Sequence, residues 1–201
     1  MPFRTVSRRR ALLAFALSTA ALLPGSLRAQ APLKVETFTG TTVNLAPGAA
    51  ERLKIDIFRW ASDADRDTLF GAIKEKGVSQ LPAALEKAQT AGYVWGSGSL
   101  GYSVKYAHRS TSPEGGERIV LVTDRRLGSW GRDAWKAAGQ ATGEEGAFTV
   151  VELRLNKQGR GEGKMSFASK VAADAATKTL SLESYAAAPV MLKDVRRGTG
   201  N

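Results

Sequence analysis

The chain has 201 residues, with 29 Lys and Arg against 19 Asp and Glu, one His and no Cys. Apolar residues make up 43% and charged residues 24%, which are ordinary globular values and exclude a disordered or collagen-like chain. The absence of Cys excludes structural disulfides, thiolate zinc sites, iron–sulfur clusters and cysteine nucleophiles. A single His excludes any site that needs two imidazoles.

The first 29 residues predict a cleaved signal peptide. Arginines at positions 4, 8, 9 and 10 form a basic head, an apolar run covers residues 11–23, and the small residue Ala29 ends the segment. The apolar run is shorter than the roughly 20 residues that a helix needs to span a bilayer. Residues 7–13 resemble the twin-arginine signature, and a general secretory signal is the alternative. We expect a periplasmic or secreted protein, cleaved near Ala29 and without a lipid anchor.

The leader also accounts for much of the positive charge. It holds five of the 29 basic residues and no acidic residue, so the remaining chain carries a net charge of +5. This value indicates a soluble surface with a mild preference for anionic partners. The chain has no long Lys/Arg run and no nucleic-acid motif, so we expect no specific nucleic-acid partner. No later segment is apolar enough to predict a membrane span.

Residues 30–197 predict one domain, followed by a short tail at 198–201. Alternation of apolar and polar residues marks about seven strands, and residues 118–123 form a β-branched run that we expect to be buried on both faces. In the segment 100–109, the alternation puts Tyr102, Val104, Tyr106 and His108 on one face. The predicted strands cover residues 51–60, 100–109, 118–123, 148–155, 164–171, 177–185 and 190–195.

Two helices are predicted between residues 62 and 92. Ser62 and Asp65 have the spacing of a capping box, and the second helix carries Pro82 in its first turn and ends at Gly92. Strands with one inserted helical hairpin predict an α+β domain. Its sheet would be largely antiparallel, sandwich-like or barrel-like, and covered by the hairpin at 62–92.

Several short motifs, taken in order, resemble a family of small exported bacterial proteins. They are Leu53-Lys54-Ile55-Asp56-Ile57, Leu100-Gly101-Tyr102, Val122-Thr123-Asp124-Arg125, Gly159-x-Gly161-x-Gly163-Lys164 and Pro189-Val190-x-Leu192-x-Asp194-Val195. The resemblance covers nearly all of the chain after the leader. It implies an exported single domain, and it transfers no activity and no catalytic residue.

Three motifs imitate known sites, and each has a simpler structural explanation. Gly96-x-Gly98-x-x-Gly101 has dinucleotide-binding spacing, but a strand follows it where that site needs a helix, so it predicts a turn. Asp63-x-Asp65-x-Asp67 imitates a calcium loop without its Gly and its final Glu, so it predicts helix capping. The glycines at 159, 161 and 163 predict a hairpin loop, with an anion cradle as the alternative. We therefore expect no metal and no cofactor.

One arrangement would suit catalysis if the fold brought its residues together. His108 and Asp124 could form a base and its orienting carboxylate if their strands are neighbours, with Ser99, Ser103 or Ser110 as the nucleophile. The chain has no Gly-x-Ser-x-Gly elbow, and Arg125 is available to pair with Asp124. A turn with a local ion pair at Thr123-Asp124-Arg125 is the structural alternative.

The segment 127–147 is long, rich in Gly and carries two Trp beside basic residues. Loops of this length are usually functional or disordered, and exposed Trp suits glycan stacking or a protein interface. The alternative is that the two Trp fold back onto the core. The candidate contact residues are Trp130, Arg132, Trp135, Lys136, Asp124 and Arg125.

Two functions follow from these patterns. The first is an exported, non-catalytic binding module whose partner is an envelope component, either a glycan or a protein. The second is an exported hydrolase that uses His108 and Asp124. The first needs no assembled catalytic set, and we therefore prefer it.

Overall fold

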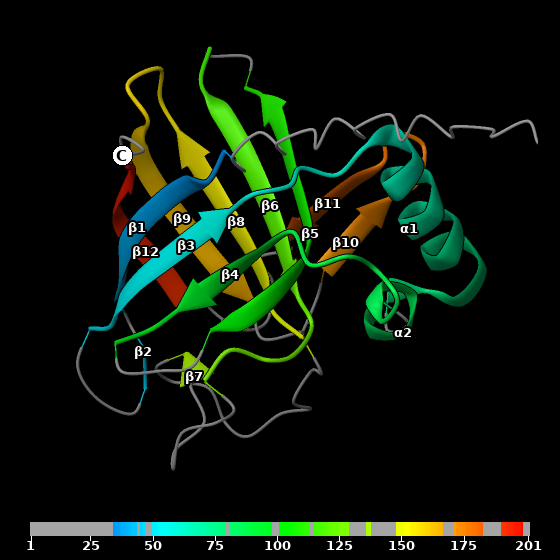
Figure 1. The fold of residues 1–201 in the computed structure, drawn as a ribbon, viewed down its shortest axis with the longest axis horizontal. Coiled ribbons are helices and arrows are strands. Elements are labelled where there is room, and N and C mark those ends of the chain that lie inside the picture. Colours follow the sequence, from blue (N-terminus) through cyan, green and yellow to red (C-terminus); the bar gives the residue numbers. More distant parts are fainter. Residues whose placement is uncertain are drawn as a thin grey trace, which may run out of the picture. The chain divides into compact units, whose positions relative to one another are not determined.

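Eight antiparallel strands close into a barrel in the computed structural model (Figure 1). The structure describes residues 34–43, 45–46, 50–78, 81–97, 101–112, 115–128, 136–137, 148–166, 171–182 and 190–198. Successive barrel strands are neighbours, and the last strand pairs with the first. The barrel strands are β1 (Glu36–Val43), β3 (Arg52–Ile57), β4 (Gly92–Trp95), β5 (Tyr102–Thr111), β6 (Glu117–Thr123), β8 (Val150–Leu155), β9 (Arg160–Ser166) and β12 (Val190–Arg197).

The remaining elements lie outside this ring of strands. Helix α1 (Asp63–Lys76) and the short helix α2 (Leu81–Leu85) connect β3 to β4, and the hairpin of β10 (Val171–Asp174) and β11 (Thr179–Leu182) connects β9 to β12. A two-residue pair, β2 (Leu45–Ala46) with β7 (Lys136–Ala137), joins the β1–β3 connection to the β6–β8 connection. Residues from Leu33 onward form one compact unit.

Apolar side chains fill the barrel interior. They come from the inward-facing positions of all eight barrel strands, and β9 contributes only Met165 because two glycines take its other inward positions. Gly163 leaves no room for a side chain, because a Cβ there would lie 2.7 Å from Leu153 Cδ2 and 2.8 Å from the Glu152 carbonyl. The interior is therefore a packed core, as small barrels usually have.

A charged cluster lies at the barrel end where β1 begins. Glu36 accepts hydrogen bonds from Arg109 at 3.0 Å and from the Trp60 indole N–H at 3.0 Å, and Arg197 pairs with Glu117. Arg109 also stacks its guanidinium 4.5 Å from the Trp60 ring centre. The opposite end, where β5 begins, carries the β2–β7 pair.

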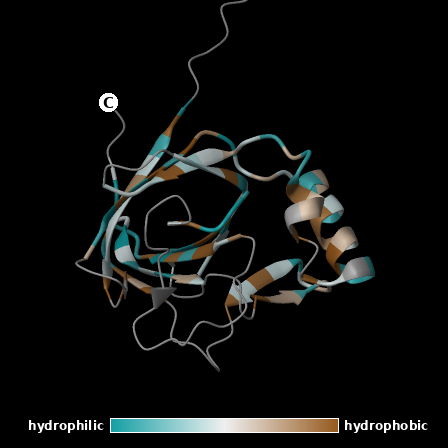
Figure 2. Ribbon diagram, turned by 90° about the horizontal axis from the view of Figure 1, so that it is seen from below, coloured by the Kyte–Doolittle hydropathy of each residue, from teal (hydrophilic) through white to brown (hydrophobic). Residues whose placement is uncertain are grey.

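A second apolar cluster lies between the barrel wall and the outer elements. The outward-facing residues Tyr106, Val120 and Val150 of β5, β6 and β8 pack against α1, α2 and the β10–β11 hairpin. Figure 2, which looks along the barrel, shows the helices outside the ring of strands on one side. Residues of β6 are consequently buried on both faces, which confirms the prediction for 118–123 from Ile119 onward.

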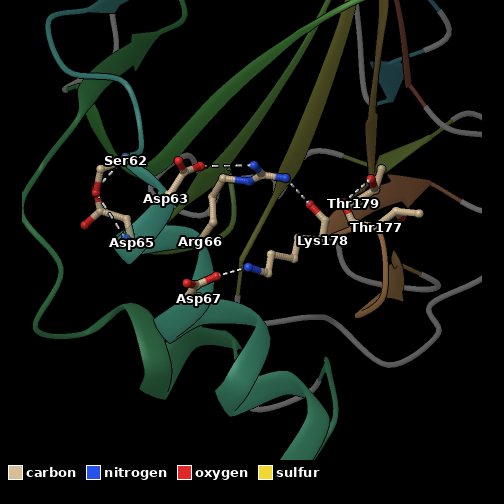
Figure 3. Close-up of polar contacts among 8 residues, drawn as sticks. All are labelled: Ser62, Asp63, Asp65, Arg66, Asp67, Thr177, Lys178 and Thr179. Carbon is tan, nitrogen blue, oxygen red and sulfur yellow. Dashed lines mark hydrogen bonds and ion pairs between the residues drawn. The ribbon is translucent and has the colours of Figure 1, made fainter.

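The first turn of α1 is tied to the β10–β11 turn (Figure 3). Ser62 and Asp65 form the predicted capping box. Arg66 donates to Asp63 at 3.4 Å and to the Lys178 carbonyl at 3.2 Å, and the Lys178 ammonium pairs with Asp67. Lys178 has φ of 49°, a left-handed value that is uncommon outside Gly, and these two contacts from α1 hold it there.

A bulge in β5 corrects the predicted face pattern. Val104 pairs with Thr123 and Tyr106 pairs with Val122, so Lys105 is the extra residue. Such an insertion shifts the alternation by one. Val104 therefore faces the barrel interior, whereas Tyr106 packs in the outer cluster.

The fold is largely β, and the prediction of an α+β domain with a helical hairpin is corrected accordingly. The second helix spans only Leu81–Leu85 and gives way to a turn at residues 86–88, well before the predicted end at Gly92. Gly92 instead begins β4, a strand that the analysis missed together with β1. The predicted strand at 164–171 overlaps the end of β9 and the first residue of β10, but β9 starts earlier, at Arg160 among the glycines.

One carboxylate is buried outside the barrel core. Glu152 of β8 is 2% exposed and accepts hydrogen bonds from Arg118 at 3.0 Å and from Arg154 at 2.9 Å. Arg118 also donates to the Leu180 carbonyl, and Lys164 donates to the Leu182 carbonyl at 3.4 Å. The cations around Glu152 thus attach the β10–β11 hairpin to the barrel wall.

Candidate functional site

Three aromatic side chains form a row on the outside of the barrel. Tyr93 and Trp95 are the outward-facing residues of β4, since Gly92 and Val94 face inward, and Phe58 follows directly after β3. The Phe58 and Tyr93 ring centres are 6.0 Å apart, and those of Tyr93 and Trp95 are 5.5 Å apart. We call Phe58, Tyr93 and Trp95 the aromatic row.

Polar groups of β3 border the aromatic row. The Lys54 ammonium lies 5.2 Å from the Trp95 ring centre and 2.9 Å from an Asp56 carboxylate oxygen. Thr37 of β1 donates to the other Asp56 oxygen at 2.7 Å. The row therefore combines apolar rings with charged and hydroxyl groups within reach of one ligand.

Local sequence explains why the rings lie on this surface. A Cβ at Gly92 would lie 2.2 Å from the Asp56 carbonyl, so Gly92 permits β4 to approach β3 closely. A Cβ at Gly101 would lie 2.5 Å from the Trp95 indole nitrogen, so the ring rests on a residue without a side chain. Tyr93 is 37% exposed, and Phe58 and Trp95 are half-buried.

The predicted contact residues Asp124 and Arg125 lie in a turn at the end of β6. Their side chains form an ion pair at 2.9 Å, which confirms the predicted local pair, and the Asp124 hydrogen bond raises the pKa of Arg125. The Asp124 amide donates to the Ser103 carbonyl. Since Trp95 follows Val94, which pairs with Tyr102, Trp95 and Asp124 lie at the same end of the barrel.

The other predicted contact residues lie in the connection between β6 and β8. The Lys136 backbone pairs with Ala46 in the β2–β7 ladder. Trp130, Arg132 and Trp135 lie outside the described residues. Their role as contact residues stays a prediction.

The structure does not bring His108 and Asp124 together. His108 pairs with Val120 of β6, and Asp124 lies four positions further along that strand, or about 13 Å at the usual rise per residue. The bulge turns His108 to the outside of the barrel, where its ring stacks on Tyr106 with centres 6.3 Å apart. The base and its orienting carboxylate therefore make no contact.

The surroundings of His108 and Tyr106 keep both side chains neutral. Burial and then the nearby charges of Arg66 and Arg118 lower the pKa of His108 below its usual value. Burial raises the pKa of Tyr106 to about 12. Neutral His108 could accept a proton, but it lacks the orienting carboxylate that the predicted pair requires.

The candidate nucleophiles do not complete a triad in the part of the chain that the structure describes. Ser103 contacts Asp124 through its backbone carbonyl, and Ser110 pairs with Arg118 in the β5–β6 ladder. Ser99 lies outside the described residues.

The Asp and Gly motifs have structural roles. Asp63, Asp65 and Asp67 each point to a different partner at the start of α1, and the described residues hold no group of three or more metal-ligating side chains. Gly161 and Gly163 lie within β9, where they pair with β8 and β12, so they do not form the alternative anion cradle.

Comparison of the chain with protein-family models, with curated proteins and with solved structures finds no match. Among the described residues, no helix is long and apolar enough to span a membrane.

The aromatic row is absent from the residues that the sequence predicts as a site. Its signal is the alternation of Gly92-Tyr93-Val94-Trp95, which is typical of a strand with one face in the core and two aromatic rings on the other face. The predicted helix up to Gly92 concealed this short strand.

Proposed function

We propose that the protein is an exported, non-catalytic binding module that holds an envelope glycan against the aromatic row. The observation that carries the proposal is the alignment of Phe58, Tyr93 and Trp95 on the barrel wall, with ring centres 5.5–6.0 Å apart. The signal-peptide pattern of residues 1–29 supports an envelope location.

The chemistry of the row favours a glycan. The C–H faces of pyranose rings stack on aromatic side chains, while sugar hydroxyls need charged or hydroxyl partners beside them. Asp56 and Lys54 provide such partners next to Trp95. Stacking on rigid aromatic rings orders few rotatable bonds on the protein side, which limits the entropy cost of binding.

A protein partner fits this surface less well. A stable protein interface buries about 800 Å² on each side and has an apolar centre. Among the described residues, only Tyr93 and Val35 are large apolar side chains with high exposure. The aromatic row is narrow, and a linear polymer matches it better than a broad protein surface.

Sedimentation with purified peptidoglycan sacculi tests the proposal. Tyr93→Ala and Trp95→Ala should each lower the bound fraction at least about tenfold, in the range of an interface hot spot. Tyr93→Phe should bind like the parent protein because it keeps the ring. Glu162→Ala is the control, because Glu162 is exposed on β9, a strand that borders neither β3 nor β4.

Two results would contradict the glycan proposal. One is that both Ala variants are folded and bind sacculi as well as the parent protein does. The other is that the parent protein itself does not sediment with the sacculi. Circular dichroism and thermal unfolding of each variant separate loss of binding from loss of fold.

A single substitution distinguishes the hydrolase hypothesis from the non-catalytic binding module. The geometry lacks the His108–Asp124 contact that the hypothesis needs. His108→Ala should leave sacculus binding and any bond cleavage within a few-fold of the parent protein. Removal of a general base would instead reduce the rate of cleavage by about 10²–10⁴.

A further inference from the structure

A pocket of about 190 Å³ lies between helices α1 and α2 on one side and strand β5 on the other. The side chains of Leu69 from α1 and of Ala84 and Leu85 from α2 form its apolar wall, and Arg59, Lys87 and Lys105 bring positive charge to it. We propose that this pocket binds a small monocarboxylic acid with a compact apolar body. The site is separate from the aromatic row and does not depend on the glycan proposal.

Asp65 is the one carboxylate among the described residues that line the pocket, and it is already neutralised. Asp65 Oδ2 accepts hydrogen bonds from the Arg59 guanidinium, the Ser62 amide and the Ser62 hydroxyl, each at 2.8 Å. The backbone hydrogen bond from Ser62 is the main cause of a lowered pKa for Asp65, so this group stays ionised. Arg59 and Asp65 therefore contribute a balanced ion pair.

Two further cations have no such partner. The Lys105 ammonium donates to the Ala88 carbonyl at 3.2 Å and to the Thr90 hydroxyl at 3.4 Å, which are neutral acceptors. Lys87 is exposed and contacts no carboxylate in the part of the chain that the structure describes. The pocket thus has a surplus of positive charge, which an anionic head group would neutralise.

The dimensions and walls of the pocket define the rest of the ligand. A cavity of about 150 Å³ suffices for a benzene ring, whereas sites for drug-sized molecules and cofactors occupy roughly 300–1,000 Å³. Leu69 and Leu85 line the pocket with apolar atoms, although only 2% and 5% of their surfaces are exposed. The pocket consequently fits one small ring or branched chain with a single carboxylate, and it is too small for a nucleotide.

Titration calorimetry with phenylacetate and its neutral analogue phenylacetamide tests the inference on the purified exported protein. Phenylacetate should bind saturably at pH 7. Phenylacetamide should bind at least about tenfold more weakly, because it lacks the negative charge. Lys87→Met should weaken phenylacetate binding several-fold and leave phenylacetamide unaffected. The matched control is Lys74→Met, which removes an exposed α1 cation outside the pocket lining.

Lys105→Met should weaken phenylacetate binding more than Lys87→Met does. Thermal unfolding of the Lys105→Met variant shows whether loss of the hydrogen bond to Ala88 also destabilises the fold. Lys87 makes no such contact, so its variant decides the result if Lys105→Met unfolds. Ala84→Leu should abolish binding because the added atoms occupy the pocket. The inference is overturned if phenylacetate shows no saturable binding up to about 10 mM. Equal affinity for acid and amide, or parental binding by Ala84→Leu, would overturn it as well.

Discussion

Replacement of Glu152 by Gln removes the one buried negative charge beneath the β10–β11 hairpin. Glu152 is 2% exposed and accepts hydrogen bonds from Arg118 at 3.0 Å and Arg154 at 2.9 Å. Gln has nearly the same size, but it is neutral and accepts through a single oxygen. The substitution therefore leaves at least one guanidinium without its acceptor and creates no cavity.

The expected loss of stability follows from the exposure of the two arginines. A hydrogen bond to a charged group contributes about 1.5–3 kcal/mol. The Arg154 side chain is 66% exposed and can turn to water, whereas the Arg118 side chain is 20% exposed and is held against Leu180. We expect the free energy of unfolding to fall by about 2–3 kcal/mol, most of it from Arg118.

The loss of stability in Glu152→Gln should become smaller as the pH falls. Burial raises the pKa of Glu152, but the hydrogen bond and charge of Arg118, the hydrogen bond of Arg154 and the charge of Lys164 together lower it by more, so the net pKa lies below the usual 4.5. A carboxyl with a lowered pKa in the folded state stabilises the fold above its unfolded pKa, and this contribution disappears as the pH falls through the folded pKa. The difference in the free energy of unfolding between parent and variant should be constant from about pH 6 to 8. It should become smaller below about pH 4.

Urea unfolding followed by tryptophan fluorescence measures this difference across the pH range. Glu162→Gln is the matched control because Glu162 is exposed and lies on the neighbouring strand β9. It should change the free energy of unfolding by less than about 0.5 kcal/mol. The reasoning is refuted if Glu152→Gln is as stable as this control, or if its deficit is the same at acid and neutral pH.

Three further outcomes are expected. Gly163→Ala should lower the free energy of unfolding by about 1–3 kcal/mol in chemical denaturation, because a Cβ there meets Leu153 at 2.7 Å. Ser62→Ala should cost about 1 kcal/mol in the same assay through loss of the α1 capping box. Replacing Arg8 and Arg9 together by Lys should block export on the twin-arginine route only, while intact-mass analysis of the parent should give an exported product that starts near Gln30.

The local hydrophobic pattern is sufficient to predict several individual strands. The predicted strands at 51–60, 118–123 and 190–195 contain β3, nearly all of β6 and most of β12. Local pattern could not show that β12 returns to pair with β1, because that contact joins residues about 150 positions apart in sequence and depends on all intervening strands. The sequence pattern therefore fits a sandwich-like and a barrel-like sheet equally well.

The errors have identifiable physical causes. Three glycines in five residues indicate a turn, which is right for Gly159, but Gly161 and Gly163 lie within β9 and permit close contact with the neighbouring strands. The bulge at Lys105 depends on cross-strand pairing, which periodicity within one strand cannot reveal. Of the candidate site, the Asp124–Arg125 pair was predictable because its residues are adjacent, whereas the aromatic row needs the pairing of β3 with β4.

The pairing of β1 with β12 has a consequence for how the chain folds. Every other strand contact in the barrel joins strands that follow one another in sequence, but this one needs the whole domain to have been synthesised. A nascent chain that lacks β12 exposes two unpaired edges, on β1 and on β9, and open edges promote aggregation. Closing the barrel is also the contact with the largest loop-closure entropy, so we expect it to form last and to limit the folding rate. On the proposed export route, translocation before this step would carry an open meander of strands, and translocation after it would carry a closed barrel.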